Sequence, residues 1–400
     1  MRHIIYHLNI SIRVKSLKGG LQTVPRTLSS RINRMVVIVG AGLSGATIAE
    51  RYANDGKKVL VIEKRCHIAG NVYDEIDERS GIRISRYGAH LFHTNDAEVW
   101  EYVQRFGKWQ RWDHKVVADI SGRLVPIPVN ITTVNMLFGE SISGEEEMRV
   151  WLEGKRVMFE VPKNSEEVAL SRVGEDLYKS LFKSYTIKQW AKEPKDLEPS
   201  VLERIPVRTS FDERYFSDKY QGIPMEGYTK LVEGMLSHPN ITVRLNTSWE
   251  SIKDDISGEE IIFTGPIDQY FAECELDKLE YRSIDFEWSW IKTAGYAQAN
   301  SVVNYPSASN PYTRSVEYKH FLGQKSEWTI VSKETTSDVG EPYYPVPTLR
   351  NRELYKKYLE MALKEKGVHF IGRLATYKYF NMDQAIRAAL DYYREHLKSH

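Results

Sequence analysis

The 400-residue sequence predicts an α/β protein: a Rossmann-like domain built from separate segments, with an inserted helical domain and an inserted antiparallel β-sheet domain. Residues 35–63 have the pattern of one strand–helix–strand unit. Residues 164–192 are mostly helical in pattern, and residues 281–332 are rich in the aromatic and β-branched residues typical of antiparallel strands. These three observations together define the fold class.

The strand–helix–strand unit is the strongest local signal. The apolar run 36–39 predicts a buried strand, helical periodicity follows over 43–54 and ends at Asp55-Gly56, and 59–62 predicts the second strand. The letters GAGLSG between the first strand and the helix form a Gly-x-Gly-x-x-Gly string. In this position the string is typical of a loop that places a dinucleotide pyrophosphate at a helix N-terminus.

Each residue type in this unit has a physical reason. Gly40 permits the tight turn, Gly42 lets the backbone approach a pyrophosphate, and Gly45 lets helix and strand pack closely. Glu63 ends the second strand, where a carboxylate can bind ribose hydroxyls. We therefore expect a dinucleotide cofactor, and this context disfavours the alternative of a glycine-rich turn without a ligand.

Two segments bear on the choice between FAD and NAD. Residues 69–71 read Ala-Gly-Asn where flavoproteins of the two-dinucleotide-binding type usually carry Gly-Gly, so this segment matches flavoproteins except for Ala69. Near the C-terminus a predicted strand precedes Gly372 and Arg373, and a helix begins near 381–383, whose N-terminus would stabilise an anionic reduced flavin. No second Gly-x-Gly-x-x-Gly string occurs, which argues against a dedicated NAD(P)H domain.

Composition narrows the protein class. No apolar run approaches the roughly 18–20 residues of a membrane span. Two cysteines, Cys66 and Cys274, exclude a disulfide framework and are compatible with a reducing compartment, so we expect a cytoplasmic protein. Residues 1–34 hold seven Lys or Arg and no acid, whereas the remainder holds 48 basic and 54 acidic residues, which argues against nucleic-acid binding. We expect residues 1–34 to be a disordered tail, the result of a start codon upstream of Met35, or a transit-like segment.

The chain is expected to alternate between three domains after this extension. The expected segments are 35–108, 224–270 and 340–397 for the dinucleotide-binding domain, 131–204 for the helical domain, and 109–130, 205–223 and 271–339 for the antiparallel sheet domain. Amphipathic helices are expected over 350–366 and 382–397, with a short strand between them. Asn164 or Ser165 is the expected cap of the first helix in the 164–192 stretch.

Two further strings carry residues suited to a phosphorylated substrate. Arg208 in RIPVR and Arg314 in PYTR lie on expected strands, and two convergent arginines make a bidentate clamp for a diphosphate. Surface salt bridging is the alternative. Tyr185 and Trp190 in SYTIKQW end a helix, where aromatic rings can stack on a base or pack in the core.

Histidines and tyrosines supply weaker signals. His90 and His93 in RYGAHLFHT lie in one compact loop without a third ligand nearby, so we expect no metal, and local hydrogen bonding is the alternative role. Tyr344 and Tyr379 can offer hydroxyls to phosphate or sugar oxygens or close a core. The sequence has no nucleophile elbow and no Cys–His nucleophile signature.

Taken together, these strings resemble the bacterial type of the UDP-galactopyranose mutase family. VIVGAGLSGA, RYGAHLFHTND, SYTIKQW, RIPVR, EPYYPV and GRLATYKYFNM follow in order from about Met35 to the last helix. The resemblance implies an isomerase that interconverts UDP-α-D-galactopyranose and UDP-α-D-galactofuranose by ring contraction. It implies reduced FAD, whose N5 is the covalent nucleophile at sugar C1, with no net redox change. An external reductant such as NAD(P)H would prime the flavin, and a homodimer is compatible with the family.

The resemblance also implies roles for individual residues. Catalysis would involve Arg208 and Arg314, as the diphosphate clamp, and His93. The implied substrate-binding residues are Tyr185, Trp190, Arg208, Tyr215, Arg314, Tyr344 and Tyr379. The implied cofactor-binding residues are Gly40, Gly42, Ser44, Gly45, Glu63, Lys64, Arg65, Asn71, His90, Arg373, Met382 and Asp383. Thr209 and Ser210 stand where an aromatic residue is common, so packing after Arg208 is left open.

Two other functions remain as rivals. An FAD-dependent oxidoreductase of the amine-oxidase type would share the nucleotide half, but the paired arginines and the aromatic loop argue against it. A catalytically inactive UDP-sugar binder would keep the same residues, and none of the assigned residues is missing.

Overall fold

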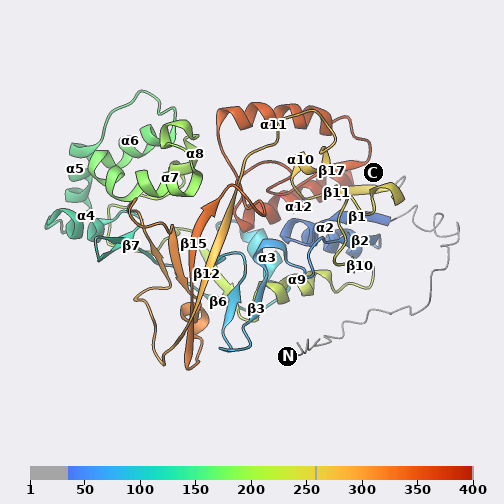
Figure 1. The fold of residues 1–400 in the computed structure, drawn as a ribbon, viewed down its shortest axis with the longest axis horizontal. Helices are drawn as coiled ribbons and strands as arrows, with labels where there is room; N and C mark the ends of the chain where they lie inside the picture. The colour runs from blue at the N-terminus through green and yellow to red at the C-terminus, as the bar shows by residue number, and fades with distance from the viewer. Residues whose placement is uncertain (1–34, 257–258, 399–400) are drawn as a thin grey trace, which may run out of the picture.

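The computed structural model describes residues 35–256 and 259–398, and the expected basic extension 1–34 lies outside them. Figure 1 shows three parts in a row: a helical part at the left, a long twisted sheet in the middle and an α/β part at the right. This arrangement confirms the predicted α/β class with helical and antiparallel insertions. No helix among the described residues is long and apolar enough to cross a membrane.

A five-stranded parallel sheet is the centre of the α/β part. Its strand order is β10–β2–β1–β11–β17, with β1 in the middle. The strands are β1 (Met35–Val39), β2 (Lys58–Ile62), β10 (Ile241–Arg244), β11 (Glu260–Phe263) and β17 (Val368–Phe370). The sheet therefore joins segments that are far apart in the sequence.

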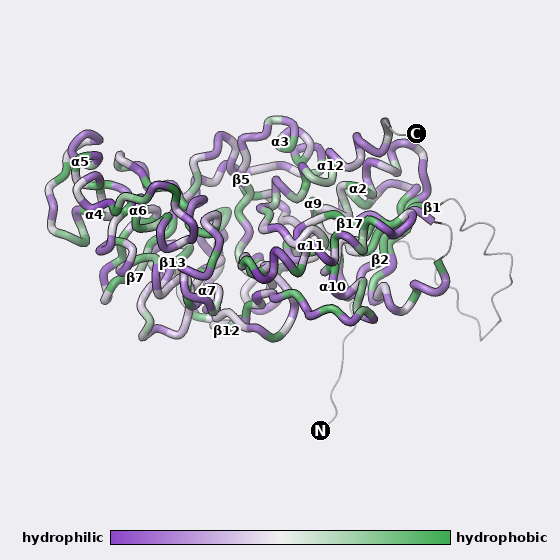
Figure 2. Tube along the Cα trace, turned by 90° about the horizontal axis from the view of Figure 1, so that it is seen from above, coloured by the Kyte–Doolittle hydropathy of each residue, from purple (hydrophilic) through white to green (hydrophobic). Residues whose placement is uncertain are grey.

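Helices cover both faces of this sheet, which explains why β1 is apolar throughout. Val36 and Ile38 pack into the core with helices α2, α3, α9 and α12, whereas Val37 faces the opposite side. Figure 2 shows the β1 and β2 strands as hydrophobic segments. The helices are α2 (Leu43–Asn54), α3 (Ala97–Gln104), α9 (Tyr228–Leu236), α10 (Ile267–Tyr270), α11 (Leu349–Ala362) and α12 (Met382–Lys398).

The middle of the molecule is a seven-stranded sheet in the order β16–β12–β15–β14–β13–β7–β8. All neighbours are antiparallel except β13 and β7. Its strands are β7 (Val116–Ile120), β8 (Arg123–Ile127), β12 (Tyr281–Lys292), β13 (Val302–Asn304), β14 (Arg314–Glu317), β15 (Trp328–Ser337) and β16 (Tyr344–Pro345). The antiparallel strands expected over 281–332 are confirmed.

Small antiparallel sheets connect the α/β part to the seven-stranded sheet. One pairs β3 (Asp74–Ile76) with β4 (Arg83–Ser85), and the other joins β5 (Phe92–Thr94), β9 (Tyr220–Pro224) and β6 (Trp109–Arg111). The buried ring of Phe92 lies near those of Trp100 and Trp109, with ring centroids 6.0 and 5.1 Å away. This aromatic cluster fixes β5, which carries His93, and the segment before it, which carries His90. The expectation that both histidines lie in one loop is therefore wrong for His93, which pairs with Gln221 of β9.

The helical part is a chain of short helices. Its elements are α4 (Ile131–Phe138), α5 (Glu145–Lys155), α6 (Ser165–Leu177), the π-helical turn η3 (Tyr178–Lys183), α7 (Ser184–Trp190) and α8 (Ser200–Glu203). The predicted cap is confirmed, because the Asn164 side chain accepts from the Glu167 amide at 2.9 Å. Gly174 interrupts α6 with φ 76°, and a Cβ there would lie 2.3 Å from the Lys155 carbonyl oxygen.

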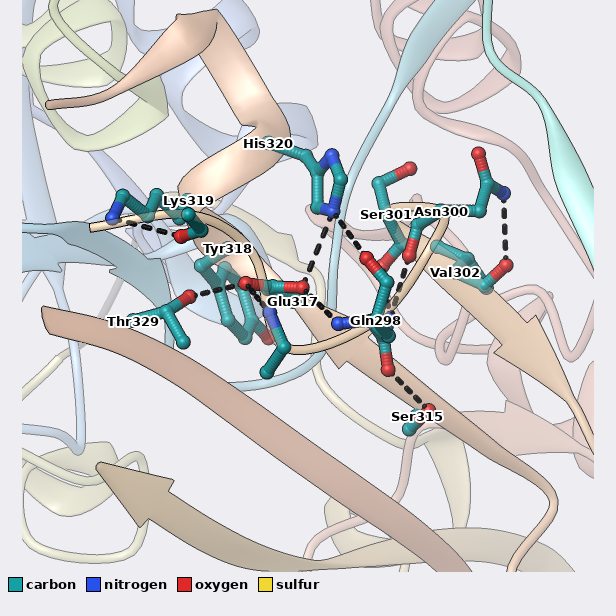
Figure 3. A network of polar contacts seen from close by, with 12 residues as sticks. Gln298, Asn300, Ser301, Val302, Ser315, Glu317, Tyr318, Lys319, His320 and Thr329 are labelled. Atoms are coloured by element: carbon teal, nitrogen blue, oxygen red, sulfur yellow. Dashed lines mark hydrogen bonds and ion pairs between the residues drawn. The ribbon is translucent and has the colours of Figure 1, made fainter. Parts of the chain in front are cut away.

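A buried polar network closes the far end of the large sheet (Figure 3). Glu317 is 0 % exposed, and its carboxylate accepts from the Gln298 amide at 2.9 Å and from the Thr329 hydroxyl at 2.5 Å. The neighbouring Lys319 ammonium donates to four backbone carbonyls. Most of these contacts hold the loop between β12 and β13 through backbone and side-chain polar groups.

Candidate active site

The first cavity, called the dinucleotide cavity below, lies at the carboxyl ends of β1, β2 and β11. Open parallel sheets bind ligands at this edge. Of the residues predicted to contact the cofactor, those that line it are Gly40, Gly42, Ser44, Glu63, Lys64, Arg65, Asn71, His90, Arg373 and Met382. Gly45 and Asp383 do not line it.

The glycine loop has the geometry that the sequence predicted. Gly40 has φ +108°, in the region that favours glycine. A Cβ on Gly45 would lie 2.0 Å from the Gly40 carbonyl oxygen, so Gly45 is required for packing and not for contact with a ligand. Gly42 caps α2 without a side-chain hydrogen bond, so the first-turn N–H groups can serve an anion. Ala69 adopts φ 73°, a strained conformation that a glycine would accept freely.

Charged residues at the end of β2 hold one another in place. The Glu63 carboxylate is 6 % exposed and accepts from the backbone N–H groups of Ala41 at 2.9 Å and Arg65 at 3.0 Å. Glu341 pairs with Lys64 at 2.8 Å and with Arg65 at 3.3 Å. Glu63 is thus fixed at the cavity wall by backbone donors, which is the placement expected of a ribose-binding carboxylate.

The second cavity, called the central cavity below, lies between α7, the large sheet and the α/β part. It has a volume of about 480 Å³. Its walls include these predicted residues: His90, His93, Tyr185, Trp190, Tyr215, Arg314, Tyr344, Arg373, Tyr379 and Met382. His90, Arg373, Asn381 and Met382 line both cavities, so ligands in the two cavities can meet at these residues.

Three guanidinium groups line the central cavity. Arg314 begins β14, and its Nε lies 2.6 Å from the Glu334 carboxylate on the paired strand β15. Arg204 follows α8, lies 4.0 Å over the Tyr379 ring and pairs with no carboxylate of the described residues. Arg373 enters from the segment after β17. Two carboxylates, Glu334 and Asp218, also line the cavity. The three arginines outnumber them, so the cavity is suited to a diphosphate.

The structure does not bring Arg208 into this cavity, and the expectation that it lies on a strand is wrong. The segment after α8 is irregular there, and the Arg208 guanidinium turns to Asp212 at 3.2 Å and to the Arg214 carbonyl at 2.7 Å. Arg204 lines the cavity in its place. Both arginines occur in the string RIPVR, and the local pattern alone could not say which of them faces a ligand.

Aromatic side chains form one wall. Trp190, from α7, packs edge-on against Tyr344 and Tyr379 with centroids 6.4 and 6.1 Å away, and these two tyrosines stack at 5.4 Å. Burial raises the pKa of Tyr344. Burial would also raise the pKa of Tyr379, but the charges of Arg204 and then Arg373 outweigh it, and the pKa is lowered. The Tyr379 hydroxyl is therefore a strong hydrogen-bond donor.

Two imidazoles of the cavity are neutral. Burial, followed by the charge of Arg373, lowers the pKa of His90 to about 4, and its Nδ1 lies 2.7 Å from the Gly88 carbonyl oxygen. A neutral ring donates from Nδ1 there, so Nε2 carries the lone pair. Burial lowers the pKa of His114, a residue the sequence did not single out, to about 3.

His93 and Asp383 have different surroundings from those expected. His93 Nδ1 lies 2.9 Å from an Asp218 carboxylate oxygen, and the ring stacks on Phe216 at 3.7 Å. Asp383 lies against Thr94, outside both cavities, and burial raises its pKa. The structure therefore does not support the expected contact between Asp383 and the cofactor. The first turn of α12 directs Met382 toward the cavities and Asp383 toward β5.

Sequence reasoning missed other lining residues of the central cavity. These are His114, Gln189, Arg204, Asp218, Asn304 and Glu334. A signal existed for Glu334, because antiparallel pairing sets it directly opposite Arg314. The register of two distant strands was needed to see it. No local pattern distinguishes His114 from an ordinary core histidine.

Known proteins resemble this chain in sequence family and in fold. A family model described as UDP-galactopyranose mutase matches residues 180–379, and one described as an NAD(P)-binding Rossmann-like domain matches residues 38–106. A solved structure of reduced UDP-galactopyranose mutase superimposes with TM-score 0.73 at 17% identity, covering 92% of this chain and 96% of that one. A putative protoporphyrinogen oxidase from Exiguobacterium reaches TM-score 0.65 at 12% identity, so the fold extends beyond mutases.

Sequence comparison is more specific. The chain is 38% identical over 373 residues to an Escherichia coli protein described as dTDP-fucopyranose mutase, covering 91% of this chain and 98% of that one. It is 37% identical over 372 residues to a probable UDP-galactopyranose mutase of Klebsiella pneumoniae, covering 92% and 96%. It is 33% identical over 375 residues to the UDP-galactopyranose mutase of Mycoplasma genitalium, covering 88% and 92%. The chain therefore belongs to the UDP-galactopyranose mutase family.

Proposed function

We propose that this protein interconverts UDP-α-D-galactopyranose and UDP-α-D-galactofuranose, with FAD in its reduced form as the cofactor. The observation that carries the proposal is the junction of the two cavities. A cavity with three arginines, suited to a nucleotide diphosphate, opens onto the dinucleotide cavity at His90 and Met382. A sugar attached to that diphosphate would therefore lie beside the ring system of the cofactor.

The residues of the dinucleotide cavity fit FAD. Gly42 leaves room for backbone contact with a pyrophosphate, α2 offers uncapped N–H groups, and Glu63 stands where a ribose would lie. The N-terminus of α12 at Met382 would add a positive dipole end near the flavin ring. When bound, reduced FAD supplies N5 as a nucleophile for sugar C1 and keeps its electrons over the full reaction.

The arginines of the central cavity act on the leaving group. Ring contraction requires UDP to leave C1 and later to return, so its diphosphate must be stabilised and held in place. Arg314, fixed by Glu334, and Arg204, which has no carboxylate partner among the described residues, are placed to do this by charge and by paired N–H donors. Arg208 has no part in this proposed role, because its guanidinium is paired with Asp212 outside the cavity.

Aromatic and histidine side chains complete the site. Trp190 and Tyr185 from α7 would cover the substrate and exclude water from C1. Tyr379, with its lowered pKa, would donate to a phosphate or sugar oxygen. His90 would offer its Nε2 lone pair at the junction of the two cavities, since its Nδ1 proton is held by Gly88. These roles require no metal ion.

The nucleotide and the sugar are the finer part of the proposal. The 38%-identical Escherichia coli relative is described as a dTDP-fucopyranose mutase, so dTDP-fucopyranose is the second candidate substrate. It differs by a methyl group on the base, a missing ribose hydroxyl and a missing sugar 6-hydroxyl. The diphosphate clamp would serve both substrates, and only contacts to the base and to the sugar would distinguish them.

The test uses purified protein with bound FAD, reduced by dithionite under anaerobic conditions. We expect UDP-galactofuranose to be converted to UDP-galactopyranose, as followed by chromatography, with a higher kcat/KM than for dTDP-fucofuranose in a parallel reaction. Faster conversion of the dTDP-sugar would reassign the substrate. No conversion of either sugar by the reduced holoprotein would refute the mutase proposal. In a separate aerobic reaction of the oxidised holoprotein, consumption of O2 in proportion to product would indicate an oxidoreductase.

A further inference from the structure

Lys188 lies on α7 outside both cavities and connects the helical part to the large sheet. Its ammonium donates to four backbone carbonyls of the loop between β13 and β14: those of Tyr305, Ser307 at 2.9 Å, Asn310 at 2.9 Å and Tyr312 at 2.8 Å. Every acceptor belongs to the loop of residues 305–312, whereas the donor belongs to α7. One side chain therefore fastens two parts of the molecule.

The Lys188 ammonium uses all of its hydrogen-bonding capacity in these contacts. An ammonium has three N–H donors and no acceptor, and here it faces four carbonyl dipoles with no carboxylate partner among the described residues. Lys319 makes a similar set of four bonds, but all its acceptors belong to the same sheet part as Lys319 itself. The Lys188 set is thus distinguished by the two parts that it joins.

Helix α7 depends on contacts outside itself. It follows the π-helical turn Tyr178–Lys183, so it is not a simple continuation of a straight α-helix. Its last carbonyls are also used by the sheet: the Thr336 hydroxyl donates to the Lys188 carbonyl, and Arg282 Nε donates to the Gln189 carbonyl at 3.3 Å. The sheet therefore holds α7 through both its backbone and the Lys188 side chain.

The two segments that Lys188 joins, α7 and the loop 305–312, both lead to walls of the central cavity. Tyr185 and Trp190, on either side of Lys188 in α7, line one wall. The loop 305–312 runs into β14, whose first residue is Arg314 on another wall. We propose that Lys188 is a positioning residue that sets the separation between the α7 wall and Arg314 by holding the 305–312 loop against α7. Its kinetic consequence rests on the proposed mutase function.

The first arm of the test is kinetic. Lys188→Met removes the charge and keeps much of the side-chain bulk, and we expect kcat/KM of the reduced holoenzyme to fall at least about tenfold with FAD content unchanged. The matched control is Lys179→Met, in the π-helical turn before α7, where an exposed ammonium pairs with exposed Glu175 at 2.6 Å. The control is expected to stay within about twofold of wild type. Lys188→Arg keeps a charge and several donors, and should recover part of the loss.

The second arm measures hydrogen exchange of backbone amides by mass spectrometry and does not depend on catalysis. In Lys188→Met, peptides covering 184–190 and 305–312 should exchange faster, while peptides of the parallel sheet should not change. Faster exchange throughout the chain would mean general destabilisation and would overturn the positioning role, as would local faster exchange with wild-type kcat/KM. If the wild-type protein has no mutase activity, the proposed function fails, while unchanged exchange at 305–312 would separately refute the Lys188 contact.

Discussion

The dinucleotide cavity and the central cavity are built on different principles. The first takes much of its wall from one stretch, residues 40–72, and it uses backbone geometry and helix N–H groups. The second takes side chains from α7, the segment after α8, β14, β15 and the C-terminal segment. A site built from backbone can be read from a short string, whereas a site built from distant side chains depends on how the elements are placed.

The largest expected effect is the loss of cofactor binding in the dinucleotide cavity, whose wall is built mainly from backbone. In Gly45→Ala the new Cβ would meet the Gly40 carbonyl oxygen at 2.0 Å, so the loop must shift. We expect loss of bound FAD and of all mutase activity, measured by visible flavin absorbance of the purified protein. Gly56→Ala is the control, because its φ is +82° but nothing lies within 4 Å, so it should keep its flavin at a stability cost of about 1–2 kcal/mol. A Gly45→Ala protein that is saturated with bound FAD would contradict this prediction.

The next effect concerns the central cavity alone. Arg314→Ala removes the guanidinium opposite Glu334, and we expect kcat to fall by about 100- to 1,000-fold, since a donor to developing charge is lost. FAD should remain bound, which separates the two cavities experimentally. Glu334 is 2 % exposed and would lose its partner, so thermal stability must be measured alongside. Arg314→Lys keeps a charge near Glu334, and wild-type rates in both variants would remove the clamp from the mechanism.

A third prediction sharpens the choice between the two arginines of RIPVR. Arg204 faces the central cavity, whereas Arg208 is held by Asp212. Arg204→Ala should raise KM for the UDP-sugar about tenfold or more, as expected for loss of a charged hydrogen bond. Arg208→Ala should leave KM within about threefold, with its cost seen in the unfolding midpoint. The reverse ranking would restore the prediction made from sequence.

The last prediction concerns stability and leaves turnover aside: it is the pH dependence of stability from His114, which is 4 % exposed. Burial lowers its pKa from the ordinary 6.5 to about 3, so between these values the unfolded chain binds the proton and the folded chain does not. The contribution of His114 to the free energy of unfolding is therefore fully present above about pH 6.5. As the pH drops below that value, the free energy of unfolding falls by about 1.4 kcal/mol per pH unit because of this group. Denaturant unfolding at several pH values should show a shallower slope in His114→Gln. An unchanged slope would mean that His114 titrates normally.

Sequence pattern predicted the parallel unit closely because its information is local. The helix expected over 43–54 is the observed α2, and Gly40 and Gly45 have the conformations and close approaches that their positions required. The antiparallel strands were also visible from their residue types. Their pairing was not, and for that reason the Arg314–Glu334 contact went unseen.

Residues in irregular segments could not be assigned in this way. Arg204 and Arg208 are four apart in a stretch without strand or helix period, so nothing local shows which side faces the cavity. Asp383 and Met382 are adjacent at the start of α12, and a rotation of about 100° per residue sends one to the cavities and the other to Thr94. Such choices are decided by packing between distant elements.

The position of β1 in the sheet has a consequence for biosynthesis. Its neighbours are β2, which follows at once, and β11, which is made some 200 residues later. Among the described elements, β17 and α12 come last. The glycine loop leaves the ribosome first, and Gly372, Arg373, Met382 and Ala385 of the opposite wall are synthesised some 330 residues later. Nascent chains that stop before residue 372 would thus lack one side of the cradle. FAD is then expected to bind only after the segment that follows β17 has left the ribosome and packed against the glycine loop.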